Sequence, residues 1–169
     1  RGIDVILNAL NLIKENEDKK YDYFVLLQPT SPLREVKHIN KAIEKIIANE
    51  NVDSLISIKE AEENPYWRVK VNKDKSLKPF LINNIGFTRR QYLPKVYIIN
   101  GAIYISKCSE FIKNKSFYEG KCLSFIMDKR SNIDIDDVID FRLAEFLMKK
   151  QINKNLEVQN EKMKQMFNA

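Results

Sequence analysis

Residues 131–137 read SNIDIDD, so acidic and aliphatic side chains alternate along this stretch. In extended backbone, Asp134 and Asp136 project to the same side, because successive side chains of a strand point to opposite faces. Two carboxylates on one side form a hard-oxygen site for Mg²⁺, whose other ligands would be water and phosphate oxygens. A second interpretation assigns these acids to the start of a final helix, where negative charge favours the helix dipole. The pattern leaves both interpretations open.

Residues 24–34, FVLLQPTSPLR, carry polar groups directly after an aliphatic run. Ligands of an open α/β sheet bind beyond the carboxyl ends of its strands, and Gln28 stands at such an end with an amide that can donate and accept. Two prolines limit the next turn, so Thr30 and Ser31 would be held in a fixed geometry. Arg34 is suited to bidentate binding of phosphate or carboxylate. A compatible alternative makes Ser31 the N-cap of a helix, with proline at its first position.

A third group of candidates lies in the apolar segment 97–106, YIINGAIYIS. Alternation along a strand predicts two faces. The core face would carry Ile99, Gly101, Ile103 and Ile105, and the opposite face would carry Ile98, Asn100, Ala102, Tyr104 and Ser106. A glycine inside a strand often marks close approach by a ligand or another backbone, and Asn100 and Tyr104 would line a polar ridge beside it. An ordinary half-buried strand explains the pattern equally well. In the preceding loop, Arg89 and Arg90 are either a clamp for an anionic substrate or ordinary surface residues.

The elements that must position these residues follow from hydrophobic periodicity. The expected order is helix 3–14, strand 23–27, helix 36–47, strand 53–58, strand 97–106, strand 123–127 and helix 137–148. This order predicts an α/β fold with a mostly parallel, Rossmann-like sheet flanked by helices, and the first strand, which has little polar alternation, is expected to be covered on both faces. The stretch between 66 and 94 predicts a β-rich excursion from the sheet. Residues 149–169 predict a polar helical or disordered tail.

Composition limits the possible functions. The chain has 169 residues, 44% hydrophobic and 31% charged, which suits one globular domain. Lysine and arginine exceed aspartate and glutamate by six, but the excess is spread over the chain, so we expect a small polyanion rather than nucleic acid as the partner. No apolar run is long enough to cross a bilayer. Cys108 and Cys122 are far apart and His38 is the only histidine, so we expect reduced thiols in a cytoplasmic protein and no zinc site.

Taken together and in order, these segments resemble the acylneuraminate cytidylyltransferase (CMP-sialic acid synthetase) family. The resemblance extends to about residue 148 and rests on LLQPTSPLR (26–34), ENPYW (63–67), RRQ followed by a proline (89–94), NGAIY (100–104) and IDIDDxxDFxxAE (133–145). The first and fourth of these segments are specific at this separation. The others would carry little weight alone.

The resemblance implies a nucleotide-diphospho-sugar transferase type of fold, with CTP and a nine-carbon 2-keto sugar acid as substrates and CMP-sugar and pyrophosphate as products. By motif match, Asp134 and Asp136 would hold Mg²⁺, Arg90 would take the negative charge of the substrate, and Gln28 would contact the sugar acid. Asn100, Gly101 and Tyr104 would line the sugar site, as would Thr30, Ser31 and Arg34 of the turn. Residues 1–148 would form one domain, residues 62–96 its dimerisation arm in a homodimer, and 149–169 a tail.

The sequence also departs from the family pattern. A glycine-containing loop that cradles the CTP phosphates is expected at the amino-terminal side, but only four glycines occur and no two lie close together. We therefore expect a carboxy-terminal portion of such an enzyme, with little or no turnover by this chain alone. Tyr92 stands where many members have aspartate, and the basic residue expected after ENPYW is either Arg68 or Lys70.

Three alternatives remain beside this interpretation. A ketodeoxyoctonate cytidylyltransferase is the nearest, although its corresponding strand typically leads into a Gly-Asp turn. A DxD-type glycosyltransferase is the second, although its DxD tends to follow a mid-domain strand. The third is a non-catalytic, dimerising remnant of the fold. The sequence does not distinguish sialic, legionaminic and pseudaminic acids as substrates.

Overall fold

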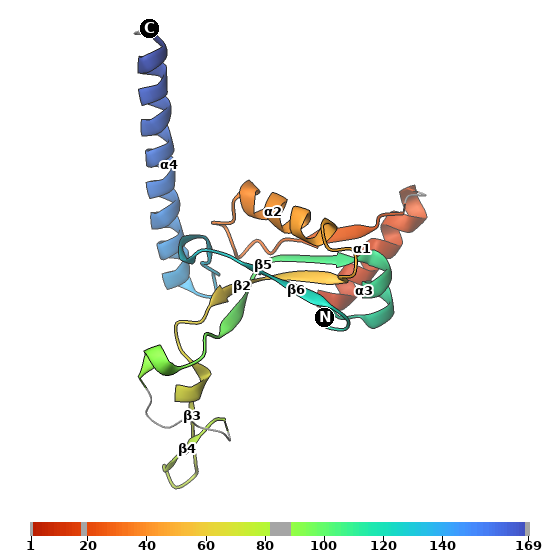
Figure 1. Cartoon of the computed structure of the whole chain (residues 1–169), viewed down its shortest axis with the longest axis vertical. Helices are drawn as coiled ribbons and strands as arrows, with labels where there is room; N and C mark the ends of the chain where they lie inside the picture. The colour runs from red at the N-terminus through yellow and green to blue at the C-terminus, as the bar shows by residue number, and fades with distance from the viewer. Residues whose placement is uncertain (1, 18–19, 82–88, 168–169) are drawn as a thin grey trace.

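A mixed four-stranded sheet forms the centre of the molecule (Figure 1). The computed structural model describes residues 2–17, 20–81 and 89–167, except for the side chains of residues 17, 90, 154–155 and 158–167. The sheet has the order β1-β5-β2-β6, with β1 at Tyr23–Leu26, β2 at Ser54–Glu60, β5 at Tyr97–Lys107 and β6 at Cys122–Ile126. Strands β1, β2 and β6 run in one direction, which confirms the mostly parallel α/β fold, while β5 lies antiparallel between β1 and β2. Sequence alone did not predict the direction of β5.

Helices cover both faces of this sheet. The α-helices are α1 at Gly2–Glu17, α2 at Val36–Ile47, α3 at Cys108–Asn114 and α4 at Val138–Phe167. Helix α2 lies on one face, and α1 and α3 lie on the other (Figure 1). Three short 3₁₀ helices are η1 at Pro65–Trp67, η2 at Arg90–Tyr92 and η3 at Lys129–Ser131. The periodicity predicted α1, α2 and the start of α4, but it missed α3, which is only seven residues long.

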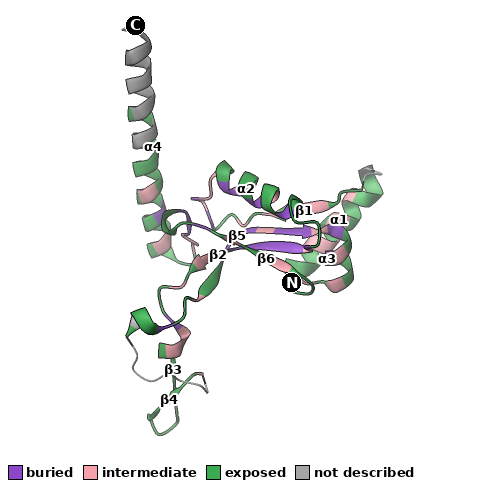
Figure 2. Ribbon diagram, viewed as in Figure 1, coloured by how far each residue is buried: buried purple, intermediate pink, exposed green. Residues whose placement is uncertain are grey.

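Two apolar layers hold the helices on the sheet. The layer under α2 contains Ala42, Ile46, Val52, Leu55, Ala102, Ile103, Ile105 and Met127. The layer under α1 and α3 is built on Ile56, Phe111 and Phe117. The ring of Phe111 lies 5.0 Å from that of Phe24 and 4.8 Å from that of Phe117, within the range of favourable aromatic pairs. Burial is concentrated in the inner strands β2 and β5 (Figure 2).

Strand β1 is partly covered on both faces. Tyr23 packs against the layer under α2, and Phe24 and Leu26 pack against the layer under α1 and α3, in line with the expectation from the apolar run. Within the described chain β1 pairs only with β5 and forms one edge of the sheet, and Val25 is 37% exposed.

The predicted β-rich excursion is a hairpin that extends away from the sheet (Figure 1). Strands β3 at Val69–Val71 and β4 at Leu77–Pro79 pair antiparallel around the turn at residues 72–76. The side chains of Val71 and Leu77, which lie opposite each other in this pairing, are 69% and 67% exposed. Residues 82–88 of this arm lie outside the described part of the chain.

Helix α4 is longer than predicted and leads away from the sheet (Figure 1). Asp137 caps it: the Asp137 Oδ1 accepts hydrogen bonds from the backbone N–H of Ile139 at 2.7 Å and of Asp140 at 3.0 Å. The predicted polar tail is helical as far as Phe167. None of the described helices combines the length and the apolar composition that a membrane span requires. Cys108 and Cys122 are free thiols.

Candidate functional site

The site is built around an irregularity in strand β5. Ile56 of β2 pairs with Tyr104, but Ile58 pairs with Ile99, so residues 100–103 of β5 lie opposite the single residue Ser57. Gly101 within this bulge has φ +73°, a left-handed conformation that glycine adopts without steric penalty. The bulge breaks the simple alternation expected for this strand. Ala102 joins the core layer under α2, and Ile99 is 40% exposed instead of lying in the core.

Side chains replace the ladder hydrogen bonds that the bulge interrupts. The hydroxyl of Ser57 accepts from the backbone N–H of Ile103 at 2.7 Å and donates to Asn100 Oδ1 at 2.6 Å. The same Asn100 oxygen accepts from the backbone N–H of Ala102 at 3.3 Å. Ser57 is fully buried, where unpaired backbone N–H groups would be costly. These hydrogen bonds stabilise the bulge.

The QPTSPLR loop after β1 docks on the carbonyl groups of this bulge. Arg34 Nη1 donates to Ala102 O at 2.7 Å and to Gln28 O at 3.1 Å, and so joins the loop to the strand. Ser31 is buried, and its hydroxyl lies 3.5 Å from Asn100 O as a donor. Partial burial lowers the pKa of Arg34 from its usual value, although the group stays cationic at neutral pH. The structure thus uses Arg34 and Ser31 inside the protein, whereas the sequence suggested contacts with a ligand.

The second interpretation of Ser31, as the N-cap of a helix, was wrong. Helix α2 begins at Val36, and its N-cap is Glu35, whose backbone N–H donates to His38 Nδ1 at 3.1 Å. A turn precedes the helix because the backbone N–H of Arg34 bonds back to Ser31 O at 3.4 Å. The proline and buried leucine between them belong to that turn, which delays the helix.

The Asn100 amide links the bulge to the acidic segment. Asn100 Nδ2 donates to Asn132 Oδ1, and it lies 3.3 Å from Met127 Sδ. Asn132 Nδ2 donates to Met127 O at 2.9 Å, which fixes the orientation of that amide. Asn100 and Asn132 are 2% and 5% exposed. Both polar ends of the Asn100 side chain are thus bonded within the protein, which gives this residue a structural role in addition to any contact with a substrate.

Three of the predicted residues converge at Gly101. A Cβ placed on Gly101 would overlap Gln28 Oε1 and would lie 3.3 Å from Asp134 Oδ2. The side chains of Gln28 and Asp134 therefore face the same point of the β5 backbone from two different segments. Tyr104 lies near them: burial raises its pKa, and repulsion from the Tyr118 phenolate at high pH and from the Asp134 carboxylate adds to the shift. Glycine at 101 makes room for an amide and a carboxylate side by side.

Asp134 presents an unpaired oxygen. Within the described part of the chain its Oδ1 is buried without a hydrogen-bond partner, and a carboxylate oxygen of this kind suits the predicted role as a Mg²⁺ ligand. Asp136 is exposed beside the start of α4, with its backbone N–H 3.2 Å from Asp140 Oδ2. The described residues contain no group of three or more His, Cys, Asp or Glu side chains that could hold a metal ion. Asp134 and Asp136 would thus need phosphate and water oxygens, in line with the coordination preference of Mg²⁺.

A second contact fixes the acidic segment at its other end. The backbone N–H of Ile135 donates to Thr30 O at 2.9 Å, so the segment pairs with the QPTSPLR loop. The side chain of Thr30 is exposed. The segment carrying Asp134 is therefore held between the loop after β1 and the bulge of β5.

Asp128 and His38 tie the start of the acidic segment to α2. Asp128 Oδ2 accepts from Ser131 Oγ at 2.9 Å and lies 3.4 Å from His38 Nε2. Burial alone would raise the pKa of Asp128, but the hydrogen bonds from Ser131 and Arg130 and the nearby His38 lower it. Because His38 Nδ1 accepts a backbone N–H, His38 Nε2 is the nitrogen that carries the proton toward Asp128 in the neutral ring.

The predicted basic contacts to the substrate stay predictions. The side chain of Arg90, predicted to hold the charge of the substrate, lies outside the described part of the chain. Lys70 is on the hairpin with its Nζ 5.0 Å from the centre of the Phe80 ring, and Arg68 ends η1. In the described part of the chain neither Arg68 nor Lys70 contacts Gln28 or Asp134, so both stay candidates for the basic residue expected after ENPYW.

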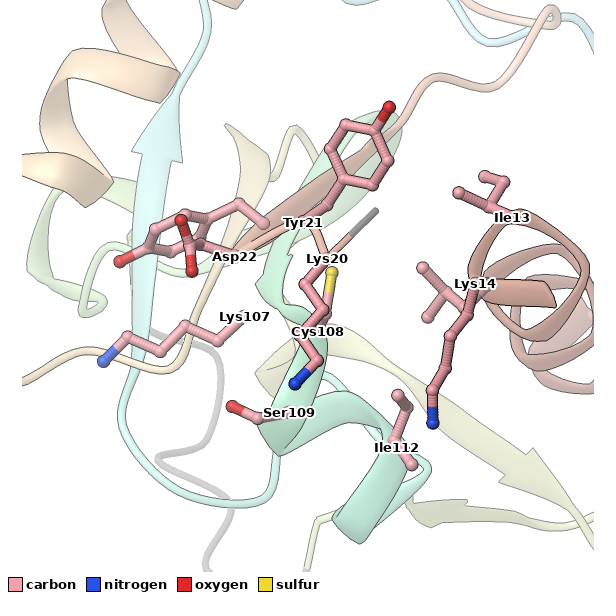
Figure 3. Close-up of a pocket in the computed structure, with 11 residues that line it drawn as sticks. Ile13, Lys14, Lys20, Tyr21, Asp22, Lys107, Cys108, Ser109 and Ile112 are labelled. Atoms are coloured by element: carbon pink, nitrogen blue, oxygen red, sulfur yellow. The ribbon is translucent and has the colours of Figure 1, made fainter. Parts of the chain in front are cut away.

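A cavity of about 550 Å³ lies at the opposite end of β1 (Figure 3). Helix α1, the segment before β1 and the start of α3 supply its walls, including Ile13, Tyr21, Cys108 and Ile112. None of the predicted site residues lines it. The candidate site is thus defined by converging polar groups at Gly101 and not by the volume of this cavity.

Two residues of the site were missed in the sequence. Ser57 was read as part of an aliphatic strand, and Asn132 was quoted in SNIDIDD without a role. One feature of the sequence could have pointed to Ser57: Ser54 and Ser57 are small polar residues within a buried strand. Buried hydroxyl groups need hydrogen-bond partners. That signal indicates a bond but does not identify the partner.

Comparison with known proteins identifies relatives along most of the chain. "Post-translational flagellin modification protein B" of Campylobacter coli is 35% identical over 159 residues, 94% of this chain and 65% of that protein. A "CMP-N,N'-diacetyllegionaminic acid synthase" of Legionella pneumophila is 33% identical over 86% of this chain and 62% of its own length. An "N-acylneuraminate cytidylyltransferase" of Escherichia coli O18:K1:H7 is 31% identical over 93% of this chain, but over only 36% of that protein. The chain spans less than two thirds of each.

Solved structures agree on the fold. A CMP:2-keto-3-deoxy-manno-octonic acid synthetase complexed with CTP matches with a TM-score of 0.53 and 12% identity, over 88% of this chain and 69% of that chain. A 4-diphosphocytidyl-2C-methyl-D-erythritol synthase from Anaerococcus prevotii matches with a TM-score of 0.52 and 12% identity, over 85% and 64%. No protein-family model matches the sequence. Over most of its length the chain is therefore homologous to proteins named N-acylneuraminate cytidylyltransferase and CMP-N,N'-diacetyllegionaminic acid synthase, which are nucleotidyltransferases.

Proposed function

We propose that this chain serves the transfer of CMP from CTP to the anomeric hydroxyl of a sialic-acid-like nonulosonic acid, with release of pyrophosphate. The observation that carries the proposal is the half-buried Asp134 carboxylate, which has an unpaired oxygen and faces Gly101 beside the Gln28 amide. The names of relatives at 31–33% identity support the reaction class. Because these names include both acylneuraminate and diacetyllegionaminic acid enzymes, the proposal extends to the class of sugar acid and not to one member.

Positioning and charge neutralisation supply most of the catalysis in such a transfer, because the protein does little covalent chemistry. Asp134 and Asp136 would hold Mg²⁺, which when bound neutralises phosphate oxygens. Gln28 offers a donor and an acceptor to the hydroxyl and carboxylate groups of the sugar acid, and Tyr104 borders the same place. Arg90 remains our proposal for the residue that takes the negative charge of the substrate. Arg34, Ser31 and Asn100 hold the loop and the bulge that present these groups.

Calorimetric titration of the purified chain with CTP in the presence of Mg²⁺ tests this assignment. We expect saturable binding that requires Mg²⁺ and is lost in Asp134→Asn, which removes the charge but keeps the side-chain shape. Asp74→Asn is the matched control, because Asp74 is an exposed carboxylate in the turn of the hairpin. Equal binding by the parent and Asp134→Asn would refute the role of Asp134.

Turnover is a separate test of the same proposal. We expect little pyrophosphate release by this chain with CTP, Mg²⁺ and N-acetylneuraminic or diacetyllegionaminic acid, because the four glycines of the sequence form no phosphate-binding loop. Release that depends on both CTP and the sugar acid would confirm the reaction class and contradict the expectation of weak activity. A non-catalytic remnant would show neither release nor Mg²⁺-dependent binding.

We also propose that the arm, residues 62–96, forms a homodimer contact. Val71 and Leu77 expose large apolar side chains on the hairpin, and such exposure is typical of an interaction surface. Sedimentation of Val71→Glu should show monomer where the parent shows dimer, while Lys78→Glu on the same hairpin is the control for added negative charge. A parent that sediments as a monomer would refute the dimer.

A further inference from the structure

The carboxylate of Asp134 is not held in place by its own hydrogen bonds. Its Oδ1 is buried and unpaired, and its Oδ2 faces the Cα of Gly101. A carboxylate intended to bind a cation must keep its oxygens free of competing donors, so its position has to be fixed from elsewhere. The neighbours of Asp134 along the chain provide this fixation.

Asn132 and Ile135 are the two fixed points on either side of Asp134. Ile135 is bonded through its backbone N–H to Thr30 O. Asn132 is bonded through its side chain to Asn100 and to Met127 O, and its own carbonyl accepts from Lys59 Nζ at 3.2 Å. Only one residue stands between Asn132 and Asp134, so a shift of Asn132 is transmitted directly to the carboxylate.

The orientation of Asn132 depends in turn on Ser57. The Ser57 hydroxyl accepts from Ile103 N–H and therefore donates to Asn100 Oδ1. That bond orients the Asn100 amide so that its Nδ2 donates to Asn132 Oδ1. Asn132 Nδ2 in turn donates to Met127 O. Between Ser57 and Asn132 both donors, the Ser57 hydroxyl and Asn100 Nδ2, point from strand β2 toward the acidic segment.

We propose that Ser57 and Asn132 are positioning residues that act through Asn100 to hold the Asp134 carboxylate opposite Gly101. This inference rests on the proposed function in that it treats Asp134 as the metal ligand. The chain of bonds itself is defined by the geometry alone. Neither residue touches the reacting groups.

Two buried serines on β2 allow a matched comparison. Ser54 and Ser57 are 1% and 0% exposed, and the Ser54 hydroxyl donates to Phe117 O at 2.5 Å, away from Asp134. Ser57→Ala and Ser54→Ala each remove one buried hydroxyl that is hydrogen-bonded. Amide hydrogen exchange is measured first, with no metal present. We expect the exchange of the Ile135 N–H to become roughly tenfold faster in Ser57→Ala and to stay unchanged in Ser54→Ala.

Titration with Mn²⁺ alone, followed by paramagnetic broadening of backbone amide signals around Gly101 and Asp134, is the second readout. We expect the dissociation constant to rise about tenfold in Ser57→Ala and in Asn132→Ala, and to stay at the parent value in Ser54→Ala. Ser57→Cys keeps a weak donor of similar size and should restore part of the affinity. If Ser57→Ala shows no cooperative unfolding transition, Ser57→Cys and Asn132→Ala provide the comparison with Ser54→Ala.

The two readouts separate this inference from the proposed function. A parent that binds no Mn²⁺ near Asp134 would refute the metal role, while the exchange of the Ile135 N–H would still decide whether Ser57 positions the segment. Equal exchange in Ser57→Ala and the parent would overturn the positioning role. Equal effects of Ser54→Ala and Ser57→Ala on the Ile135 N–H would also overturn it, because they would indicate a general loss of stability.

Discussion

Replacing Gly101 with alanine should both destabilise the fold and displace the site. A non-glycine residue in the left-handed region costs about 1–2 kcal/mol, and φ at Gly101 is +73°. The added Cβ would also overlap Gln28 Oε1, and moving that flexible side chain off its rotamer costs about 0.5–1 kcal/mol more. The sum is about 1.5–3 kcal/mol, which corresponds to a fall in Tm of roughly 3–12 °C for a chain of this size.

A second glycine provides a close control for this substitution. Gly120 has φ +82°, and a Cβ there would overlap Oδ2 of Asp53, which directly precedes β2 and is not among the groups that face Gly101. Gly120→Ala should therefore lower the free energy of unfolding by a similar amount, measured by urea denaturation. Only Gly101→Ala should also weaken Mg²⁺-dependent binding of CTP, because only that substitution pushes against Gln28 and Asp134.

A double-mutant cycle with Gln28→Ala separates the two costs at Gly101. Removing the Gln28 side chain should recover the steric part, about 0.5–1 kcal/mol, and leave the backbone part of about 1–2 kcal/mol. Full recovery in the double variant would refute the left-handed conformation of Gly101. A single variant as stable as the parent would refute both parts of the reasoning.

Other substitutions test the supports of the site. Arg34→Met should lower the free energy of unfolding by about 2–4 kcal/mol in urea, because it removes charge-assisted bonds to Gln28 O and Ala102 O; a loss below 0.5 kcal/mol would contradict that. The pKa of Asp128 is lowered in the fold, so the stability that its carboxylate contributes is present above about pH 4 and is lost as the pH falls further. In Asp128→Asn the Tm measured by thermal unfolding should therefore fall less between pH 7 and pH 3 than it does in the parent. Asp137→Ala should cost about 0.5–2 kcal/mol and reduce the helical signal in circular dichroism, because it removes the cap of α4.

Hydrophobic periodicity predicted the positions of helices and strands more reliably than it predicted how they pack and pair. Amphipathic spacing placed α2 at 36–47, and of the apolar positions that define this spacing Ile46 is buried on the sheet, while Val36 and Ile47 are exposed. The apolar run of β1 likewise predicted a strand with helices on both faces, and its side chains contact both core layers, although Val25 is 37% exposed. The direction of β5 was not predictable in this way, because strand pairing depends on segments that are distant in sequence.

The sequence identified several residues of the site, but it did not identify the groups with which they form hydrogen bonds. Gln28 and Asp134 were identified from their residue types, and the structure brings both side chains to Gly101, where the sequence had indicated a ligand or another backbone. Arg34 and Asn100 were identified in the same way, yet their polar groups are bonded within the protein. An arginine or asparagine near a strand end can serve a ligand or a backbone carbonyl equally well. Only the register of β5 against β2 decides between these uses.

That register explains why the structure departs from regular pairing here. A continuous β5–β2 ladder would bond the backbone of residues 100–103 without help from side chains. The bulge instead takes hydrogen bonds from the buried Ser57 hydroxyl and the partly buried Arg34, and beside it one oxygen of Asp134 is buried without a hydrogen-bond partner in the described part of the chain. An unsatisfied buried oxygen costs about 1–3 kcal/mol, so stability alone does not favour this arrangement. In return, the bulge places Gly101 where an amide and a carboxylate can lie side by side, and local strain of this kind concentrates at functional sites.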